Sequence, residues 1–167
     1  MVILIALQLI SGPEVYFHAR ANALVIRYPV GPESVAVYYS LDGASWRGYW
    51  MARKGEFYES YIDLTNRPTI LALIFRVGER IDDNSGDLYL YELRWQPRSI
   101  LRIDFITLER MLLVAKAKLM EPDYRDEAGN ILDYLDRIVS RLPRYRKPFN
   151  RRVQELRMRV GNLKIGD

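Results

Sequence analysis

The acidic loop at residues 82–87 is the densest group of side chains that could carry chemistry. It places three carboxyl groups, Asp82, Asp83 and Asp87, within six positions, and Asn84 adds an amide. Two carboxyl groups held close together could serve as the acid and base of a glycosidase, and clustered oxygen donors could bind calcium. In a loop rich in glycine and asparagine, such side chains more often hydrogen-bond to nearby backbone amides. We therefore expect a hairpin turn here, with neither a catalytic pair nor a metal ion.

Histidine and cysteine chemistry is nearly absent from the chain. The sequence contains no cysteine and a single histidine, His18. Thiol nucleophiles, cysteine-based zinc sites and disulfides are therefore excluded, and one chain cannot supply a multi-histidine metal site. A histidine triad is excluded in the same way unless a second chain completes it, and no glycine-rich phosphate loop with its lysine is present. We expect a protein that is not an enzyme and that uses no cofactor.

A run of basic residues near the C-terminus suits the binding of an anion. Residues 141–164 contain nine basic residues and one acid, Glu155, for a net charge of +8. Tyr145 and Phe149 lie among the arginines, a combination suited to phosphate contacts and base stacking, to anionic lipid or to an acidic protein surface. The residues that we expect to contact a polyanion are Arg144, Arg146, Lys147, Arg151 and Arg152. Alternatively, these arginines form ion pairs with acids of the preceding helix, such as Asp136.

Closely spaced turn signals divide residues 11–97 into segments of strand length. In residues 34–41 the apolar side chains alternate along the chain, which is typical of a strand with one buried face. Residues 57–64 and 69–77 follow a similar pattern, and the second segment is apolar on both faces. Seven or eight such strands predict an immunoglobulin-like antiparallel β-sandwich. We assign it to residues 1–105 and expect the apolar start of the chain to form its first strand.

Residues 106–167 predict a basic helical extension of two to three helices. A first helix is expected to run from Thr107, as its N-cap, to about Met120. In residues 124–142 the apolar positions recur at spacings of three and four, which predicts one continuous stripe on a helix. These positions are Ala128, Ile131, Leu135, Ile138 and Leu142. The same spacing returns after residue 148, and each stripe must be covered by the rest of the chain or by a second copy in a homo-oligomer.

Charge is divided unevenly between the two predicted parts. Residues 1–97 hold nine Lys and Arg against eleven Asp and Glu, a net charge of −2, whereas residues 98–167 hold sixteen against ten, a net charge of +6. The excess of arginine over lysine is a weak indication of a thermophile. No segment is long and apolar enough for a transmembrane helix. The start of the chain lacks the basic region and cleavage pattern of a signal peptide, so a cytoplasmic location is slightly favoured over secretion.

The hairpin VAVYYSLDGASW and the loop IDDNSGDLY carry a family resemblance. Both stretches lie in residues 35–93, and a methionine and a strand with an aromatic residue lie between them. This part of the chain resembles starch-binding carbohydrate-binding modules of the family 25 type. The resemblance implies a sugar site at Trp46, Asp83, Asn84 and Tyr89. The loop departs from that family's W-D-N-N-x-G-x-x-Y pattern where Ile81 replaces the tryptophan and Asp83 replaces the first asparagine.

Two functions follow as hypotheses. The first is a non-catalytic carbohydrate-binding module for an α-glucan-like polysaccharide, with a helical extension for assembly. Aromatic rings stack on the C–H faces of pyranose rings, and amides and carboxylates bind the hydroxyl groups. The alternative is a structural or assembly protein whose basic helices bind nucleic acid or an acidic protein partner.

Overall fold

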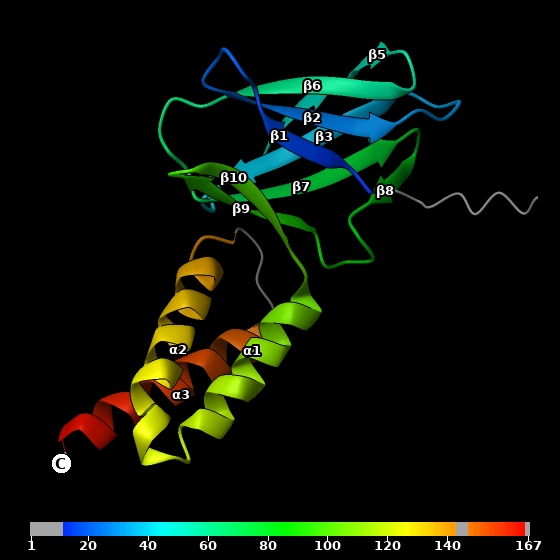
Figure 1. Ribbon diagram of the computed structural model, residues 1–167. Helices are drawn as coiled ribbons and strands as arrows, with labels where there is room; N and C mark the ends of the chain where they lie inside the picture. The colour runs from blue at the N-terminus through cyan, green and yellow to red at the C-terminus, as the bar shows by residue number, and fades with distance from the viewer. Residues whose placement is uncertain (1–11, 143–146, 166–167) are drawn as a thin grey trace, which may run out of the picture.

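The computed structural model describes residues 12–142 and 147–165. Within these residues the chain forms two antiparallel sheets followed by three α-helices (Figure 1). This confirms the prediction of antiparallel β structure followed by a helical C-terminal part. The expected first strand in residues 1–11 and the candidates Arg144 and Arg146 lie outside the described residues.

The first sheet has four strands in the order β1-β2-β6-β5. Its strands are β1 (Glu14–Phe17), β2 (Ala23–Pro29), β5 (Ala52–Lys54) and β6 (Phe57–Asp63). Every neighbouring pair is antiparallel. Side chains therefore alternate between the face toward the second sheet and an outer face.

The second sheet has the strand order β10-β9-β7-β3-β4, and β8 pairs separately with β7. Its strands are β3 (Val35–Leu41), β4 (Arg47–Trp50), β7 (Ile70–Val77), β8 (Arg80–Asp82), β9 (Tyr89–Trp95) and β10 (Arg98–Ile103). The sequence-predicted strands at 34–41, 57–64 and 69–77 correspond to β3, β6 and β7, with ends that differ by one residue at most.

The two sheets pack face to face around one apolar core. Leu24 and Ile26 of β2 face Val37 of β3 and Leu71 and Phe75 of β7, and all five side chains are buried. Their alternate spacing within each strand places all of them on the inner face. Burial of this apolar area is the main stabilising contribution to the β structure.

Three α-helices follow the last strand. They are α1 (Phe105–Lys118), α2 (Arg125–Val139) and α3 (Lys147–Ile165), with a short 3-10 turn η1 (Pro122–Tyr124) before α2. The prediction that Thr107 is the N-cap of the first helix is wrong. The backbone N–H of Leu108 donates to the carbonyl of Asp104, so the helix begins at Phe105 and Thr107 lies in its first turn.

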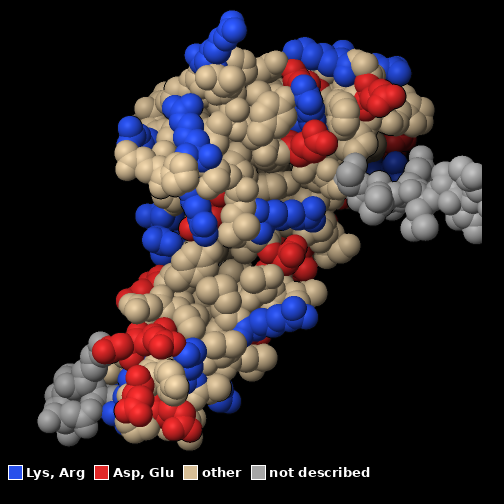
Figure 2. Space-filling view, in the orientation of Figure 1, with Lys and Arg blue, Asp and Glu red and all other residues tan. Residues whose placement is uncertain are grey.

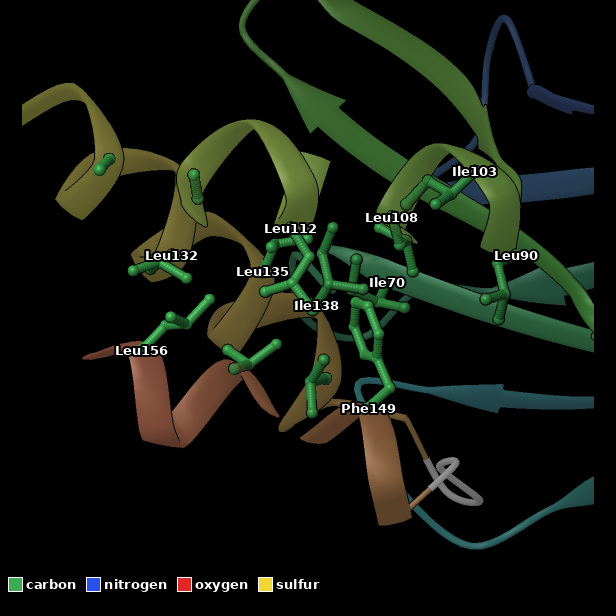
Figure 3. Packing of buried hydrophobic residues seen from close by; sticks show 14 of the residues in the cluster. Ile70, Leu90, Ile103, Leu108, Leu112, Leu132, Leu135, Ile138, Phe149 and Leu156 are labelled. Atoms are coloured by element: carbon green, nitrogen blue, oxygen red, sulfur yellow. The ribbon is translucent and has the colours of Figure 1, made fainter. Parts of the chain in front are cut away.

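The helices form a second apolar core on the other side of the second sheet. Ile70 and Ala72 of β7 point away from the first sheet and pack with Leu108 of α1, Ile138 of α2 and Phe149 of α3 (Figure 3). This packing explains why residues 69–77 are apolar on both faces. It also covers the predicted helical stripes from within the chain, although in α2 Leu132 is fully buried and the predicted Ile131 only partly.

A buried carboxylate helps to hold the helices against the sheet. Glu92 of β9 is 8% exposed. Its carboxylate lies 3.5 Å from the guanidinium of Arg137 in α2 and 2.9 Å from that of Arg94. The hydroxyl of Tyr134 in α2 also donates to it, at 3.4 Å.

None of the described helices combines the length and apolar character needed to cross a membrane.

Candidate ligand-binding groove

An open groove lies on the outer face of the four-stranded sheet. This sheet lies on the side of the molecule away from the helices (Figure 1). Its volume is about 540 Å³. Strands β1, β2, β5 and β6 and the turn after β1 supply its lining. The lining residues are Tyr16, His18, Ala19, Val25, Arg27, Lys54, Phe57, Glu59 and Tyr61.

Two tyrosines form the walls of this groove above an aliphatic floor. In the register of the sheet Tyr16 of β1 is opposite Val25 of β2, and Val25 is opposite Tyr61 of β6. Val25 is 2% exposed, whereas Tyr16 is 36% and Tyr61 is 46% exposed. Adjacent strands are about 4.8 Å apart, so the backbones that carry the two tyrosines are about 10 Å apart. Both rings thus project from the sheet on either side of Val25.

A buried carboxylate lies one row further along the sheet. Glu59 of β6 is opposite Arg27 of β2 and is 6% exposed. Its Oε1 accepts hydrogen bonds from Lys54 Nζ and from the Tyr61 hydroxyl, each at 2.6 Å. Its Oε2 accepts one from Arg27 Nε at 2.9 Å. Lys54 also donates to the Tyr61 oxygen at 3.0 Å, which closes a ring of three hydrogen bonds.

These hydrogen bonds hold Glu59 in its charged form. The ammonium of Lys54, the hydroxyl of Tyr61 and the guanidinium of Arg27 lower the pKa of Glu59 from 4.5 to about 2, although burial acts in the opposite direction. The same contacts raise the pKa of Lys54 above its ordinary value, chiefly through the hydrogen bond to Glu59. A general base works best with a pKa near the working pH. Glu59 is therefore suited to fixing the orientation of its neighbours and poorly suited to proton transfer at neutral pH.

The cations of the groove also lie against its aromatic rings. The guanidinium of Arg27 is 5.1 Å from the ring centre of Tyr16 and 5.7 Å from that of Phe57. The ammonium of Lys54 is 4.9 Å from the ring centre of Tyr61. Such cation–π contacts hold the tyrosine rings in place. The groove therefore presents fixed aromatic surfaces next to two half-exposed hydrogen-bond donors.

His18 stands at the other end of the groove. Its ring meets Tyr61 edge to face, with the ring centres 6.0 Å apart. Its Nδ1 accepts a hydrogen bond from the backbone N–H of Arg20 at 3.2 Å. In the neutral ring Nε2 then carries the proton and can donate. No cluster of His, Asp and Glu suited to a metal ion occurs in residues 12–142 and 147–165.

The residues implied by the family resemblance are not brought together. Trp46 is half-buried and packs against the core formed with the helices, whereas Tyr89 is 8% exposed and lies between the two sheets. The second sheet therefore separates them. The hydroxyl of Tyr89 donates to the Asp82 carboxylate at 2.9 Å, and Phe75 meets its ring edge to face. Tyr89 thus acts as a core residue that anchors the acidic loop.

The side chains of the acidic loop bond to its own backbone, as predicted, but the expected hairpin is wrong, because β8 and β9 do not pair with each other and both pair with β7. Asp83 accepts a hydrogen bond from the backbone N–H of Gly86 at 2.8 Å. The amide of Asn84 donates to the carbonyl of Leu88 at 3.0 Å, and Asn84 has a φ of 57°, in the left-handed region that asparagine tolerates. Asp83 and Asn84 therefore have local structural roles, away from the tyrosine groove.

Other aromatic residues near Trp46 divide between core and surface. Met51 is buried, whereas the neighbouring Trp50 is 66% exposed on the edge strand β4. Tyr49 is 48% exposed and stacks on Tyr39 with the ring centres 5.9 Å apart. These rings belong to the second sheet and do not line the groove on the first.

Arg151, Arg152 and Arg157 of α3 are paired with acids. Arg151 bonds Glu155 at 2.9 Å and Arg152 contacts Glu109 of α1 at 3.1 Å. Arg157 contacts Asp133 and Asp136 of α2, at 3.0 and 2.7 Å. Figure 2 shows basic and acidic side chains interspersed on the visible face of the helices. Of the remaining candidates, Arg144, Arg146 and the side chain of Lys147 lie outside the described part of the chain.

The groove was not predicted from the sequence, although part of its signal is present there. Phe57, Glu59 and Tyr61 occupy alternate positions of one predicted strand and so share a face. The apolar pattern of residues 57–64 indicates only the opposite, buried face. Comparison with known proteins gives no significant match: no family model, curated protein or solved structure matches this chain.

Proposed function

We propose that this chain is a non-catalytic carbohydrate-binding protein and that the groove on the outer face of the first sheet is its binding site. The observation that carries the proposal is the pair of exposed tyrosines, Tyr16 and Tyr61, on either side of Val25. A pyranose ring has an apolar C–H face that stacks on such rings. The backbones that carry the two rings are about 10 Å apart, a spacing that suits a chain of several sugars better than a single small ligand.

The charged groups beside the tyrosines suit the hydroxyl groups of a sugar. The side chains of Arg27 and Lys54 are 38% and 52% exposed, so each can donate to a ligand while keeping its bond to Glu59. Glu59 neutralises one of the two cations, which leaves the site with little net charge. A neutral α-glucan-like polysaccharide therefore suits the groove better than a polyanion does.

The strand order supports an immunoglobulin-like topology as the fold type. When the strands are lettered in chain order, the order across the first sheet is A-B-E-D, as in immunoglobulin domains, with β1, β2, β6 and β5 in these places. In the second sheet β9, β7, β3 and β4 take the places of G, F, C and C′, and β10 adds a strand at the edge. Sandwiches of this kind hold their loops and sheet faces rigidly enough to present a binding surface.

The basic helices give less support to the alternative of nucleic-acid or acidic-protein binding. Arg151, Arg152 and Arg157 each contact at least one carboxylate, so much of their charge is neutralised within the chain. Counterion release from a polyanion requires cations that can reach phosphate groups. For this reason we place carbohydrate binding first.

Affinity electrophoresis in gels with and without glycogen or amylopectin tests the proposal. We expect the polysaccharide to retard the wild-type protein, and Tyr16→Ala or Tyr61→Ala to weaken binding by about five- to tenfold. Loss of one stacked ring costs about 1 to 1.4 kcal/mol. The matched control is Tyr49→Ala, which removes a similarly exposed tyrosine from the other sheet.

Thermal melts of the same variants separate binding from folding. The two groove tyrosines are 36% and 46% exposed, so their loss should leave the protein folded. The proposal fails if the wild-type protein migrates equally in both gels. It also fails if Tyr49→Ala weakens retention as much as the groove variants do.

A further inference from the structure

We propose that α1 is a dimerisation helix, and that its exposed face pairs antiparallel with the same face of a second copy of the chain. This face and the turn that follows it carry four large exposed apolar side chains. Ile106 is 64%, Leu113 57%, Val114 46% and Met120 79% exposed. At about 100° per residue Ile106, Leu113, Val114 and Ala117 fall within roughly 100° of the helix surface. Met120 lies in the turn, two residues beyond the end of α1.

The opposite face of α1 is already used within the chain. Leu108, Leu112, Ala115 and Leu119 are buried against α2, α3 and the second sheet. The helix is therefore apolar on two opposite faces, and the structure covers one of them. A stripe of large exposed apolar side chains of this kind is typical of a protein–protein contact.

Two exposed charges, one in the stripe and one just after it, indicate what covers it. Arg110 lies in the stripe, and Glu121 lies in the turn that follows α1, three residues beyond Lys118. Along the helix axis, a two-fold axis between Val114 and Ala117 places Arg110 of each copy level with Glu121 of the other. The face is therefore complementary to itself when the two helices run antiparallel, as an isologous interface requires.

The same axis also aligns the apolar side chains. Leu113 and Met120 lie on one side of the stripe, so Leu113 of each copy comes next to Met120 of the other. At the crossing point Ala117 is small enough to let the helices approach closely. A parallel pair would instead bring like charges together at Arg110 and at Glu121.

The position of α1 in the molecule leaves room for this arrangement. Its N-terminal end joins the sheets and its C-terminal end lies far from them (Figure 1). An antiparallel pair therefore places the two β parts at opposite ends of the dimer. A helix of 14 residues is about 21 Å long, so the contact is smaller than a standard interface of about 1,600 Å². We expect a reversible dimer with a dissociation constant on the order of micromolar.

Sedimentation velocity of the full chain over a concentration series tests the proposal with a charge-swap cycle. Arg110→Glu and Glu121→Arg should each weaken the dimer at least about tenfold, because each places like charges opposite one another. The double variant should restore dimerisation to near the wild-type level. Arg53→Glu, an exposed charge reversal on β5, is the control and should dimerise as the wild type does.

The variant Leu113→Glu gives a second test, at a position midway along the length of the stripe. Leu113 is exposed, so the variant should fold, with an unchanged melting profile at low concentration, and remain a monomer throughout the series. A wild-type chain that is monomeric at several hundred micromolar overturns the proposal. So does a dimer that is unaffected by Leu113→Glu, or single charge reversals that the double variant fails to rescue. Retention on glycogen does not depend on these substitutions, so the outcome is distinct from that of the sugar-binding experiment.

Discussion

Replacement of Glu59 by glutamine should reduce stability in a way that depends on pH. The wild-type carboxylate accepts hydrogen bonds from Lys54, Tyr61 and Arg27. Glutamine keeps one acceptor oxygen and turns an NH₂ group toward donors. Hydrogen bonds to a charged group are worth about 1.5 to 3 kcal/mol each. Lys54 and Arg27 are partly exposed and can rehydrate, so we expect a net loss of about 2 kcal/mol at pH 7.

The sign of the pH dependence follows from the lowered pKa of Glu59. Its pKa is about 2 in the folded protein, compared with the ordinary 4.5. A lowered pKa contributes stability that is fully present above the unfolded value and is lost as pH falls toward the folded one. The difference between wild type and Glu59→Gln should therefore be constant above about pH 5.5. By pH 3 most of the difference should be lost.

Thermal and urea denaturation at pH 7, 5.5, 4 and 3 provide the measurement. For a chain of this size a loss of about 2 kcal/mol lowers Tm by roughly 4 to 8 °C at pH 7. Tyr61→Phe keeps the ring but removes one donor, so it should show a smaller loss with the same pH trend. A destabilisation of equal size at pH 7 and pH 3 would refute the reasoning, because it would show that the carboxylate charge is not responsible.

Two substitutions test the packing on the face of the second sheet that is turned away from the first sheet. Phe149→Ala should lower the free energy of unfolding, measured by urea denaturation, by about 3 to 5 kcal/mol, because Phe149 is 1% exposed in the helical core. The control is Met158→Ala on the same helix. Met158 is 63% exposed, so its loss should change this free energy by less than about 0.5 kcal/mol. Equal losses would contradict the observed packing of α3. Gly48→Ala should cost about 1 to 2 kcal/mol in thermal melts, because its new Cβ would lie 2.6 Å from the Tyr38 ring, and Gly31→Ala, with no atom within 4 Å, is the neutral control.

The sequence alone was sufficient for the classes of structure and their order along the chain. Turn residues at short intervals exclude helices from residues 11–97, and alternation of apolar side chains predicts strands there. The helical stripe in residues 124–142 likewise predicted α2. Its register was less well determined, because Ile131 and Leu132 are both apolar and only packing decides which is fully buried.

The candidate groove depended on strand pairing, which local patterns do not reveal. Alternation shows that Glu59 and Tyr61 share a face, but not that β2 and β5 are the neighbours of β6. Arg27 is 32 residues from Glu59 in sequence and meets it only through the register of β2 with β6. A shift of one residue in that register would turn Arg27 toward the core.

Tertiary structure also decided which apolar and charged residues remain available at the surface. Tyr89 belongs to the loop motif that resembles a sugar site, but its side chain lies in the core, because it points from β9 into the space between the sheets. The basic run in α3 has acidic partners on α1 and α2. The sequence suggested that such ion pairs form, but it did not show which acids take part. Local pattern determines which side chains face the same way. Long-range packing determines what each face meets, and hence which tyrosines, arginines and leucines are left for a ligand or a second copy.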